Sequence, residues 1–204
     1  MSDGRLDGGK AEFIAAVLAG GQGKRLGMDK ATLQIGACSL LDKILATLRG
    51  MFPLILLVVQ EAGSPLAARE DDEVKVVADV IPGKGPLVGI YTALRNSPAP
   101  YVFVMACDMP YPSRELICRM LSMAPGADAV VPKRGEYIEP LFAVYRRDIA
   151  DSIQARIEEG RLKIHELIEE LDVRYLEEDE IAACDPGFRS FFNINTPEDL
   201  EAAF

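Results

Sequence analysis

Apolar runs of strand length alternate along the chain with stretches that repeat apolar residues at helical spacing. The runs are continuous, which is typical of strands buried on both faces of a parallel sheet; they lie at 13–19, 54–59, 74–78 and 101–107. Between them, segments at 40–48, 86–94 and 113–122 have the period of amphipathic helices. Strands that alternate with helices in this way predict a doubly wound α/β sheet with helices on both faces.

The second half of the chain adds a different kind of pairing. An apolar segment at 127–132 is followed by a short turn and by a second apolar segment at 137–145, which predicts an antiparallel excursion at the sheet edge. Residues 146–171 are charged and helical in pattern, with a break near Gly160. The overall prediction is a single-domain, three-layer α/β/α fold with a mostly parallel sheet and a small antiparallel edge.

The two ends of the chain differ in character. Residues 1–12 are polar and glycine-rich, so we expect a disordered leader followed by one domain over 13–204. The last segment, 191–204, predicts a short strand and then a helix, with Thr196 as its N-cap and Pro197 at its first position.

The first strand runs into a loop, 20–30, that is rich in glycine and positive charge. Glycines let a backbone come close to a ligand and present its N–H groups. The loop also carries three cations, although the chain has a formal net charge of -10. The cations are Lys24, Arg25 and Lys30. This local reversal of sign predicts an anion site.

Two common phosphate motifs do not fit this loop. The glycines at 21, 23 and 27 are spaced one residue too widely for a dinucleotide fingerprint. A P-loop would need a glycine where Leu18 stands and a Ser or Thr after Lys24. The anion site must therefore be of another kind.

Composition narrows the class of protein further. The chain has 204 residues, 49% of them hydrophobic, which is enough for one sizeable core. Its pI near 4.7 argues against nucleic-acid or anionic-membrane binding. Four cysteines without close spacing make zinc or a disulfide framework poor predictions, and no signal peptide or membrane span is evident. We expect a reduced, cytoplasmic enzyme.

Acidic residues follow two of the predicted strands. Asp79 directly follows the strand at 74–78, and Asp108 directly follows the strand at 101–107. Ligands of an open parallel sheet bind beyond the carboxyl ends of its strands, so both carboxylates should share a rim with the glycine loop. Glycine N–H groups and cations suit phosphate, and a carboxylate suits Mg²⁺, which takes one or two protein carboxylates. The rim therefore predicts a nucleotide site.

The loop sequence LAGGQGKRLGMDKA, at 18–31, resembles the signature of the molybdenum cofactor guanylyltransferases. The loop's double glycine and its Asp-Lys pair resemble the residues found in that branch of the nucleotidyltransferases. The sugar-phosphate and cytidylyl branches more often show other residues there. Three further stretches also resemble the family: GPL at 85–87, EPLFAVY at 139–145 and NINTP at 193–197. The resemblance covers most of the chain and implies the Rossmann-like nucleotidyltransferase fold.

The resemblance also implies an activity: transfer of GMP from GTP to molybdopterin, with release of pyrophosphate and with Mg²⁺ as the metal. The acceptor phosphate and the α-phosphate of GTP are both anionic. Their charges must therefore be neutralised, and the two groups must be held in line for attack. The acceptor phosphate is already ionised at pH 7, so no general base is needed. Transient partners among the molybdenum cofactor biosynthesis proteins are implied as well.

The family's site residues can be carried over where the motifs match. The resemblance implies that Arg25, Lys30 and Asp108 are catalytic and that Asp108 holds the metal. The implied nucleotide-binding residues are Leu18, Ala19, Gly20, Gly21, Gly23, Lys30, Asp79, Gly85, Pro86, Leu87 and Asp108. The implied acceptor-binding residues are Glu139, Pro140, Asn193 and Asn195.

Simpler roles stand beside these assignments. Asp108 and Asp79 could merely end their strands or cap a turn, Lys30 could be an ordinary surface lysine, and Asn193 and Asn195 could serve turn chemistry. His165, the single histidine, lies on a charged amphipathic segment far from every motif, so we expect a surface or packing role for it.

One departure from the family leaves the base preference open. The second strand is followed by QEAGSP at 60–65, where the family often shows an Asn or a Ser-Asn-Arg that helps to hold guanosine. Rival interpretations are a related transferase that uses CTP with molybdopterin or another phosphorylated acceptor, and a nucleotide-binding regulator without catalysis. A purely structural protein would have no reason to gather cations at one glycine loop.

Overall fold

The structure is a computed structural model that describes residues 12–20, 34–35, 38–196 and 199. Ten strands are present in this part of the chain. They are β1 Phe13–Leu18, β2 Gln34–Ile35, β3 Cys38–Ser39, β4 Ile55–Val59, β5 Val74–Ala78, β6 Tyr101–Ala106, β7 Ala129–Arg134, β8 Tyr137–Ile138, β9 Phe142–Arg146 and β10 Val173–Leu176. The predicted leader and most of the glycine loop lie outside the described residues.

Six α-helices and three 3₁₀ turns connect the strands of the described chain. The helices are α1 Leu40–Arg49, α2 Pro86–Asn96, α3 Arg114–Met123, α4 Ala150–Glu158, α5 Ile164–Ile168 and α6 Glu178–Cys184. The 3₁₀ turns are η2 Pro65–Arg69, η3 Arg147–Ile149 and η4 Arg189–Phe191. None of the helices described is both long and apolar enough to cross a membrane.

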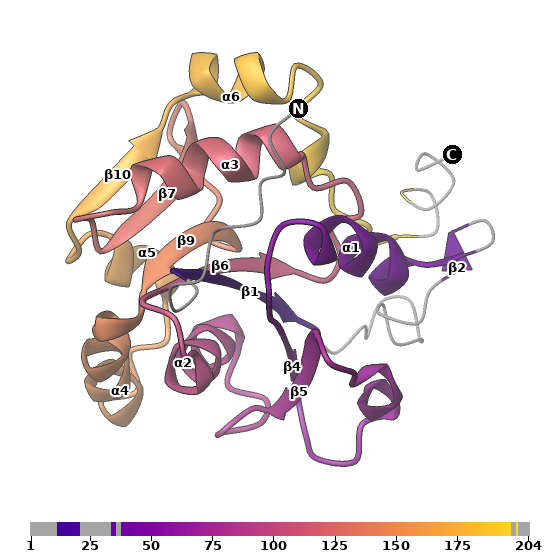
Figure 1. Ribbon diagram of the computed structural model, residues 1–204. Helices are drawn as coiled ribbons and strands as arrows, with labels where there is room; N and C mark the ends of the chain where they lie inside the picture. The colour runs from indigo at the N-terminus through magenta and orange to yellow at the C-terminus, as the bar shows by residue number, and fades with distance from the viewer. Residues whose placement is uncertain (1–11, 21–33, 36–37, 197–198, 200–204) are drawn as a thin grey trace.

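The central sheet has the strand order β10-β7-β9-β6-β1-β4-β5, with β8 paired to the side of β7 (Figure 1). The strands β6, β1, β4 and β5 are parallel to one another, as predicted. The strand β9 is antiparallel to both of its neighbours, β6 and β7. Antiparallel pairing is thus confirmed, but most of it lies inside the sheet and not at its edge.

Alternate residues of the central strands enter two separate cores. From β1, Phe13, Ala15 and Val17 pack with the apolar faces of α1 and α3, and α6 adds Ile181 to this core. The intervening residues Ile14, Ala16 and Leu18 pack with α2, and α4 and α5 extend that second core. Helices therefore cover both faces of the sheet, which confirms the three-layer α/β/α prediction (Figure 1).

Local signals explain where the helices begin. Ser39 caps α1, because its side chain accepts a hydrogen bond from Asp42 N while the Asp42 carboxylate accepts one from Ser39 N. Pro86 begins α2 directly after Gly85. Gly85 has a φ of 89°, a conformation that glycine adopts without strain.

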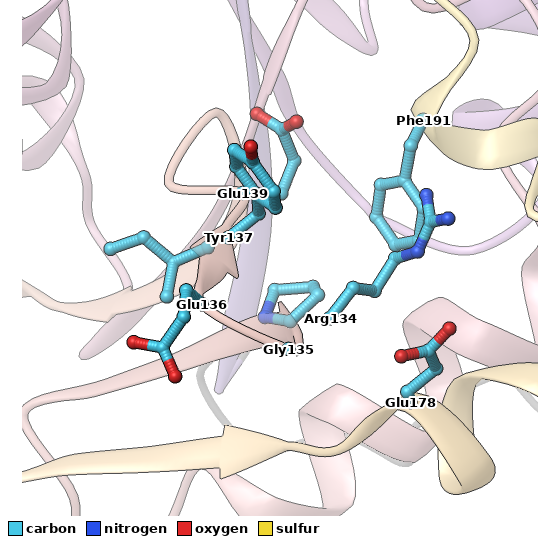
Figure 2. A pocket seen from close by; sticks show the side chains of 9 residues that line it. Arg134, Gly135, Glu136, Tyr137, Glu139, Glu178 and Phe191 are labelled. Carbon is cyan, nitrogen blue, oxygen red and sulfur yellow. The ribbon is translucent and has the colours of Figure 1, made fainter.

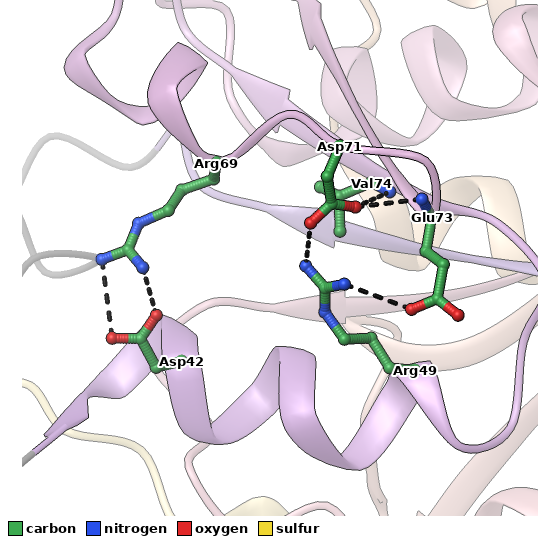
Figure 3. A network of polar contacts seen from close by, with 6 residues as sticks. All are labelled: Asp42, Arg49, Arg69, Asp71, Glu73 and Val74. Carbon is green, nitrogen blue, oxygen red and sulfur yellow. Dashed lines mark hydrogen bonds and ion pairs between the residues drawn. The ribbon is translucent and has the colours of Figure 1, made fainter.

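The helix α1 is also tied to the turn η2 by ion pairs (Figure 3). The guanidinium of Arg69 contacts the Asp42 carboxylate, and Arg49 contacts both Asp71 and Glu73. Burial tends to raise the pKa of Asp42, but hydrogen bonds from Ser39 and the charge of Arg69 hold it below its usual value. The network fixes η2 and the start of β5 beside α1.

The C-terminal part of the described chain departs from prediction. The strand expected at the start of 191–204 is wrong: residues 192–195 lie in no strand, and η4 precedes them. Ile194 N donates to Asp108 O at 2.9 Å, but a single bond does not make a strand ladder. Thr196 does accept a hydrogen bond from Asp199 N at 3.1 Å, as expected of an N-cap. The strand β10 and the helix α6 were not predicted.

Candidate nucleotide-transfer site

The carboxyl ends of four parallel strands form one continuous rim. Ala19 N donates to Val58 O at 2.8 Å, and Cys107 N donates to Leu18 O at 3.1 Å. Asp79 N donates to Val59 O at 2.8 Å. These bonds extend the sheet ladder by one residue beyond β1, β6 and β5. The residues that follow the strands are therefore held in fixed register at the point where the strand order reverses around β1.

Gly20 begins the glycine loop at the centre of this rim. A Cβ placed on Gly20 would lie 3.4 Å from Gln60 N and 3.6 Å from Asp79 Oδ2. The loop therefore leaves the sheet directly beside the Asp79 carboxylate, as the shared-rim argument predicts. Four of the predicted site residues lie outside the described chain: Gly21, Gly23, Arg25 and Lys30. Their roles stay predictions.

Asp79 is half-buried and is oriented by α2. Thr92, fully buried on that helix, donates its hydroxyl to Asp79 Oδ1 at 2.9 Å. The same hydroxyl accepts from Val80 N at 3.3 Å, so it fixes both the carboxylate and the turn after it. Burial raises the pKa of Asp79, and the hydrogen bond from Thr92 opposes that shift. In the Asp79 carboxylate, Oδ1 is therefore held by Thr92, whereas Oδ2 faces Gly20.

Asp108 lies across the rim from Asp79, just beyond β6, and is half-buried. Its backbone oxygen accepts the hydrogen bond from Ile194 N, which brings Asn193 and Asn195 to the rim. The Asn193 side chain donates to Phe191 O at 3.1 Å, so part of its hydrogen bonding serves its own turn. Asn195 is exposed, and its backbone N–H bonds to the Asp199 carboxylate at 2.9 Å.

Glu139 brings a second carboxylate close to Asp108. Burial raises the pKa of Glu139, a hydrogen bond from Leu141 N lowers it, and the negative charge of Asp108 raises it further. The segment is anchored at its backbone, because Glu139 N donates to Pro132 O at 3.0 Å. Tyr145, completely buried, donates its hydroxyl to Pro140 O at 2.7 Å. The backbone of this segment is therefore held at both Glu139 and Pro140, with the Glu139 carboxylate within electrostatic reach of Asp108.

The carboxylates of Asp108 and Glu139 are the kind of oxygen donor that Mg²⁺ prefers. No group of three or more His, Cys, Asp or Glu side chains suited to a metal occurs among the residues that the structure describes. Mg²⁺ does not need such a group, because it usually takes one or two protein carboxylates and completes its shell with phosphate and water. Asp108, with Glu139 beside it, is a donor set of this kind.

A cavity of about 490 Å³ has Glu139 in its wall (Figure 2). We call it the hairpin cavity because the hairpin formed by β7 and β8 makes most of its wall. Its lining residues are Pro132, Arg134, Gly135, Glu136, Tyr137, Ile138, Glu139, Glu178 and Phe191. Of these residues, Glu139 alone was predicted from the sequence as part of the site. The positive turn at Lys133 and Arg134 in an acidic chain was a signal for the hairpin, whereas nothing in the sequence pointed to Glu178.

The remaining predicted residues divide between the rim and the periphery. Gly85 and Pro86 are exposed at the start of α2, and Leu87 is buried beneath them. Leu18 and Ala19 are buried and act through their backbone groups in the rim. His165 is exposed on α5, as expected of a surface role.

A doubly wound sheet with a glycine loop and two carboxylates at its switch point defines a nucleotide-binding α/β enzyme. The family model described as the MobA-like NTP transferase domain matches residues 15–175. The chain therefore belongs to the MobA-like NTP transferase family, and it is a nucleotidyltransferase.

Individual relatives agree with this family. The molybdenum cofactor guanylyltransferase of Syntrophotalea carbinolica is 35% identical over 92% of this chain and 88% of its own length. The enzyme of the same name from Desulfosudis oleivorans is 33% identical over 92% of each chain. Among solved structures, molybdopterin-guanine dinucleotide biosynthesis protein A from Archaeoglobus fulgidus superposes with a TM-score of 0.81 at 33% identity, covering 93% of this chain and 95% of that one.

Proposed function

We propose that this enzyme transfers GMP from GTP to molybdopterin, releasing pyrophosphate and forming molybdopterin guanine dinucleotide. The names of relatives at 33–35% identity over nearly the whole chain support both substrates. The observation that carries the proposal is that Glu139 lines the hairpin cavity and lies within electrostatic reach of Asp108, which follows β6 at the rim. Two substrates bound on either side would bring their phosphates together at these carboxylates.

In the proposed reaction an oxygen of the acceptor phosphate attacks the α-phosphorus of GTP. A new P–O bond forms, the bond to the bridging oxygen of the β-phosphate breaks, and pyrophosphate leaves with that electron pair. The acceptor phosphate is already ionised at pH 7, so no side chain has to remove a proton. The task of the protein is to hold two anionic groups in line.

The residues divide this task between them. Asp79 would orient the ribose of the nucleotide, with Gly20 giving the backbone room beside it. Asp108 would hold Mg²⁺ with Glu139 nearby, and the ion would neutralise phosphate charge when bound. Arg25 and Lys30 are proposed to stabilise the triphosphate and the departing pyrophosphate. Glu139, Pro140, Asn193 and Asn195 are proposed for the acceptor side.

The test is a comparison of nucleotides with the purified full-length chain, molybdopterin and Mg²⁺. Pyrophosphate release should be rapid with GTP and slower by at least about tenfold with CTP, because the proposal assigns guanine selectivity. Equal or faster release with CTP would move the protein to the cytidylyl branch while leaving the site chemistry intact. No release with any nucleotide would contradict the transfer reaction itself.

Two accompanying predictions concern the surroundings of the enzyme. Transient contact with other molybdenum cofactor biosynthesis proteins and a cytoplasmic location both stay predictions. The first is implied by the family resemblance, and the second follows from the cysteine pattern and from the sequence analysis of the first residues.

A further inference from the structure

We propose that the hairpin cavity binds the 2-amino-4-oxopyrimidine edge of a pterin, with Glu178 accepting its two N–H groups and Arg134 donating to its oxo group. This inference rests on the proposed function, because the pterin is the end of molybdopterin that lies furthest from the phosphate. It goes beyond that function by assigning acceptor recognition to residues that no motif of the sequence contains.

The position of the cavity suits the far end of the acceptor. Glu139 lines the cavity and also lies within electrostatic reach of Asp108. An acceptor whose phosphate is held at Asp108 would therefore extend past Glu139 into the cavity. The volume of about 490 Å³ falls within the usual range for small-molecule sites, roughly 300 to 1,000 Å³, so a bicyclic ring fits.

Aromatic rings provide apolar surface at the sides of the cavity. Phe191 stands at the wall next to Arg134, whereas Tyr137 lies on the opposite side of the opening (Figure 2). Phe191 is held edge-on against the buried ring of Phe142, with 5.5 Å between the centroids. Tyr137 is 84% exposed, an unusual position for an aromatic side chain unless a flat ligand covers it. The two rings give a flat heterocycle something to pack against.

Arg134 is the cation of this cavity. Its guanidinium carbon lies 4.3 Å from the centroid of the Phe188 ring, which supports the planar group from one face. Phe188 has a left-handed φ of 51° and lies just before η4, the turn that also carries Phe191. No carboxylate within the described part of the chain forms an ion pair with Arg134. Its N–H groups are therefore available to a ligand acceptor.

Glu178 stands at the same wall but on a different element, α6. Two residues further on, Glu180 is occupied by an ion pair with Arg119 at 2.6 Å. Glu178 has no such pairing with a cation of the described residues, and its carboxylate borders the cavity (Figure 2). The same helix thus uses one glutamate for structure and presents the other to the cavity.

The chemistry of the two side chains selects the ligand. A 2-amino-4-oxopyrimidine edge presents an amino N–H, a ring N–H and a carbonyl oxygen in a row. An ionised carboxylate accepts two parallel N–H bonds, and a guanidinium donates to the carbonyl. A pyrimidine-2,4-dione, such as lumazine, places an oxygen where the amino group stood and would direct it at the carboxylate. The pair therefore predicts a preference for pterin over lumazine.

Fluorescence titration of the full chain with pterin and, separately, with lumazine tests this assignment. The wild type should bind pterin roughly tenfold or more tightly than lumazine. Glu178→Gln should weaken pterin binding by about 10- to 100-fold and abolish the preference, because an amide accepts at one atom only. Arg134→Met should weaken both ligands. Asp179→Asn and Lys133→Met, neighbours that do not line the cavity, should bind as the wild type does.

Three results would overturn the inference: no pterin binding by the wild type at millimolar concentration, equal affinity for lumazine, or an unchanged preference in Glu178→Gln. Thermal unfolding with GTP separates this failure from failure of the proposed function. A GTP-dependent rise in the midpoint that survives in Glu178→Gln and Arg134→Met shows that these variants fold and retain the nucleotide side. Absence of that rise in the wild type would count against the proposed function instead.

Discussion

The nucleotide half of the rim, at β1, β4 and β5, and the acceptor half, at β7, β8 and β9, are built in different ways. In the nucleotide half every strand is parallel, and each site residue is placed by the ladder bond that ends its own strand. In the acceptor half the strands are antiparallel, and the hairpin cavity is closed only when η4 and α6 pack against the hairpin.

The two halves therefore differ in how their site residues are held in position. A carboxylate such as Asp79 inherits its position from the sheet and from one buried hydroxyl. Glu139 depends on longer-range support, because Tyr145 holds the next residue from the other end of β9. The nucleotide half should therefore tolerate changes elsewhere, whereas the acceptor half should be sensitive to its supporting shell.

The largest effect is expected where the two halves meet. Asp108→Asn should lower the rate of GMP transfer by roughly 100-fold or more, because an amide binds Mg²⁺ and neutralises phosphate charge far less well. The thermal midpoint should change little. Pyrophosphate release and thermal unfolding provide the two measurements. Asp148→Asn, at an exposed carboxylate of η3, is the matched control; a near-normal rate in Asp108→Asn would refute the assigned role.

A smaller effect is expected from the support of the acceptor half. Tyr145→Phe leaves Pro140 O without its buried donor, which should cost about 1–3 kcal/mol of unfolding free energy. The KM for molybdopterin should rise while the KM for GTP stays constant. Tyr91→Phe removes a half-buried hydroxyl that donates to Gln154 and should cost less. If both KM values rose together in Tyr145→Phe, the two halves would not be separately supported.

The smallest effect is expected in the nucleotide half. Thr92→Val removes the hydroxyl that bonds Asp79, so the KM for GTP should rise about fivefold, with the acceptor unaffected. The hydrogen bond lowers the pKa of Asp79, and its loss should raise that pKa further. As the pH falls, the KM for GTP should then begin to rise at a higher pH than in the wild type. Steady-state kinetics over pH, with Thr47→Val as control, measures this shift; coincident profiles would contradict it.

Most strands of the nucleotide half, and the positions of its carboxylates, can be predicted from the sequence. Continuous apolar runs predict β1, β4 and β6, because strands buried on both faces carry almost no polar residues. The edge strand β5 is also predicted by its run of valines, although it includes Lys75 and has exposed positions. The residue after each run lies at the rim for purely geometric reasons. Asp79 and Asp108 could therefore be placed from the sequence, although the hydroxyl of Thr92 could not.

The acceptor half is only partly visible in the sequence. The strand β10 has four residues, of which Leu176 alone is fully buried, too short a pattern to stand out, and α6 is short and acidic. The segment after η4 resembles a strand because apolar and polar residues alternate in it, yet its backbone makes a single bond to Asp108 and joins no sheet. The hairpin cavity joins residues from Pro132 to Phe191, and such a juxtaposition follows from tertiary packing and not from any local pattern.

The interior place of β9 has a consequence for how the chain folds. The strands β7 and β10 reach the rest of the sheet only through β9, which is made of residues that follow β7 in the chain. During synthesis, β1, β4, β5 and β6 can pair before β9 has emerged, whereas β7 must wait for it. The half of the molecule that binds the nucleotide can therefore form first and serve as the template on which the other half condenses.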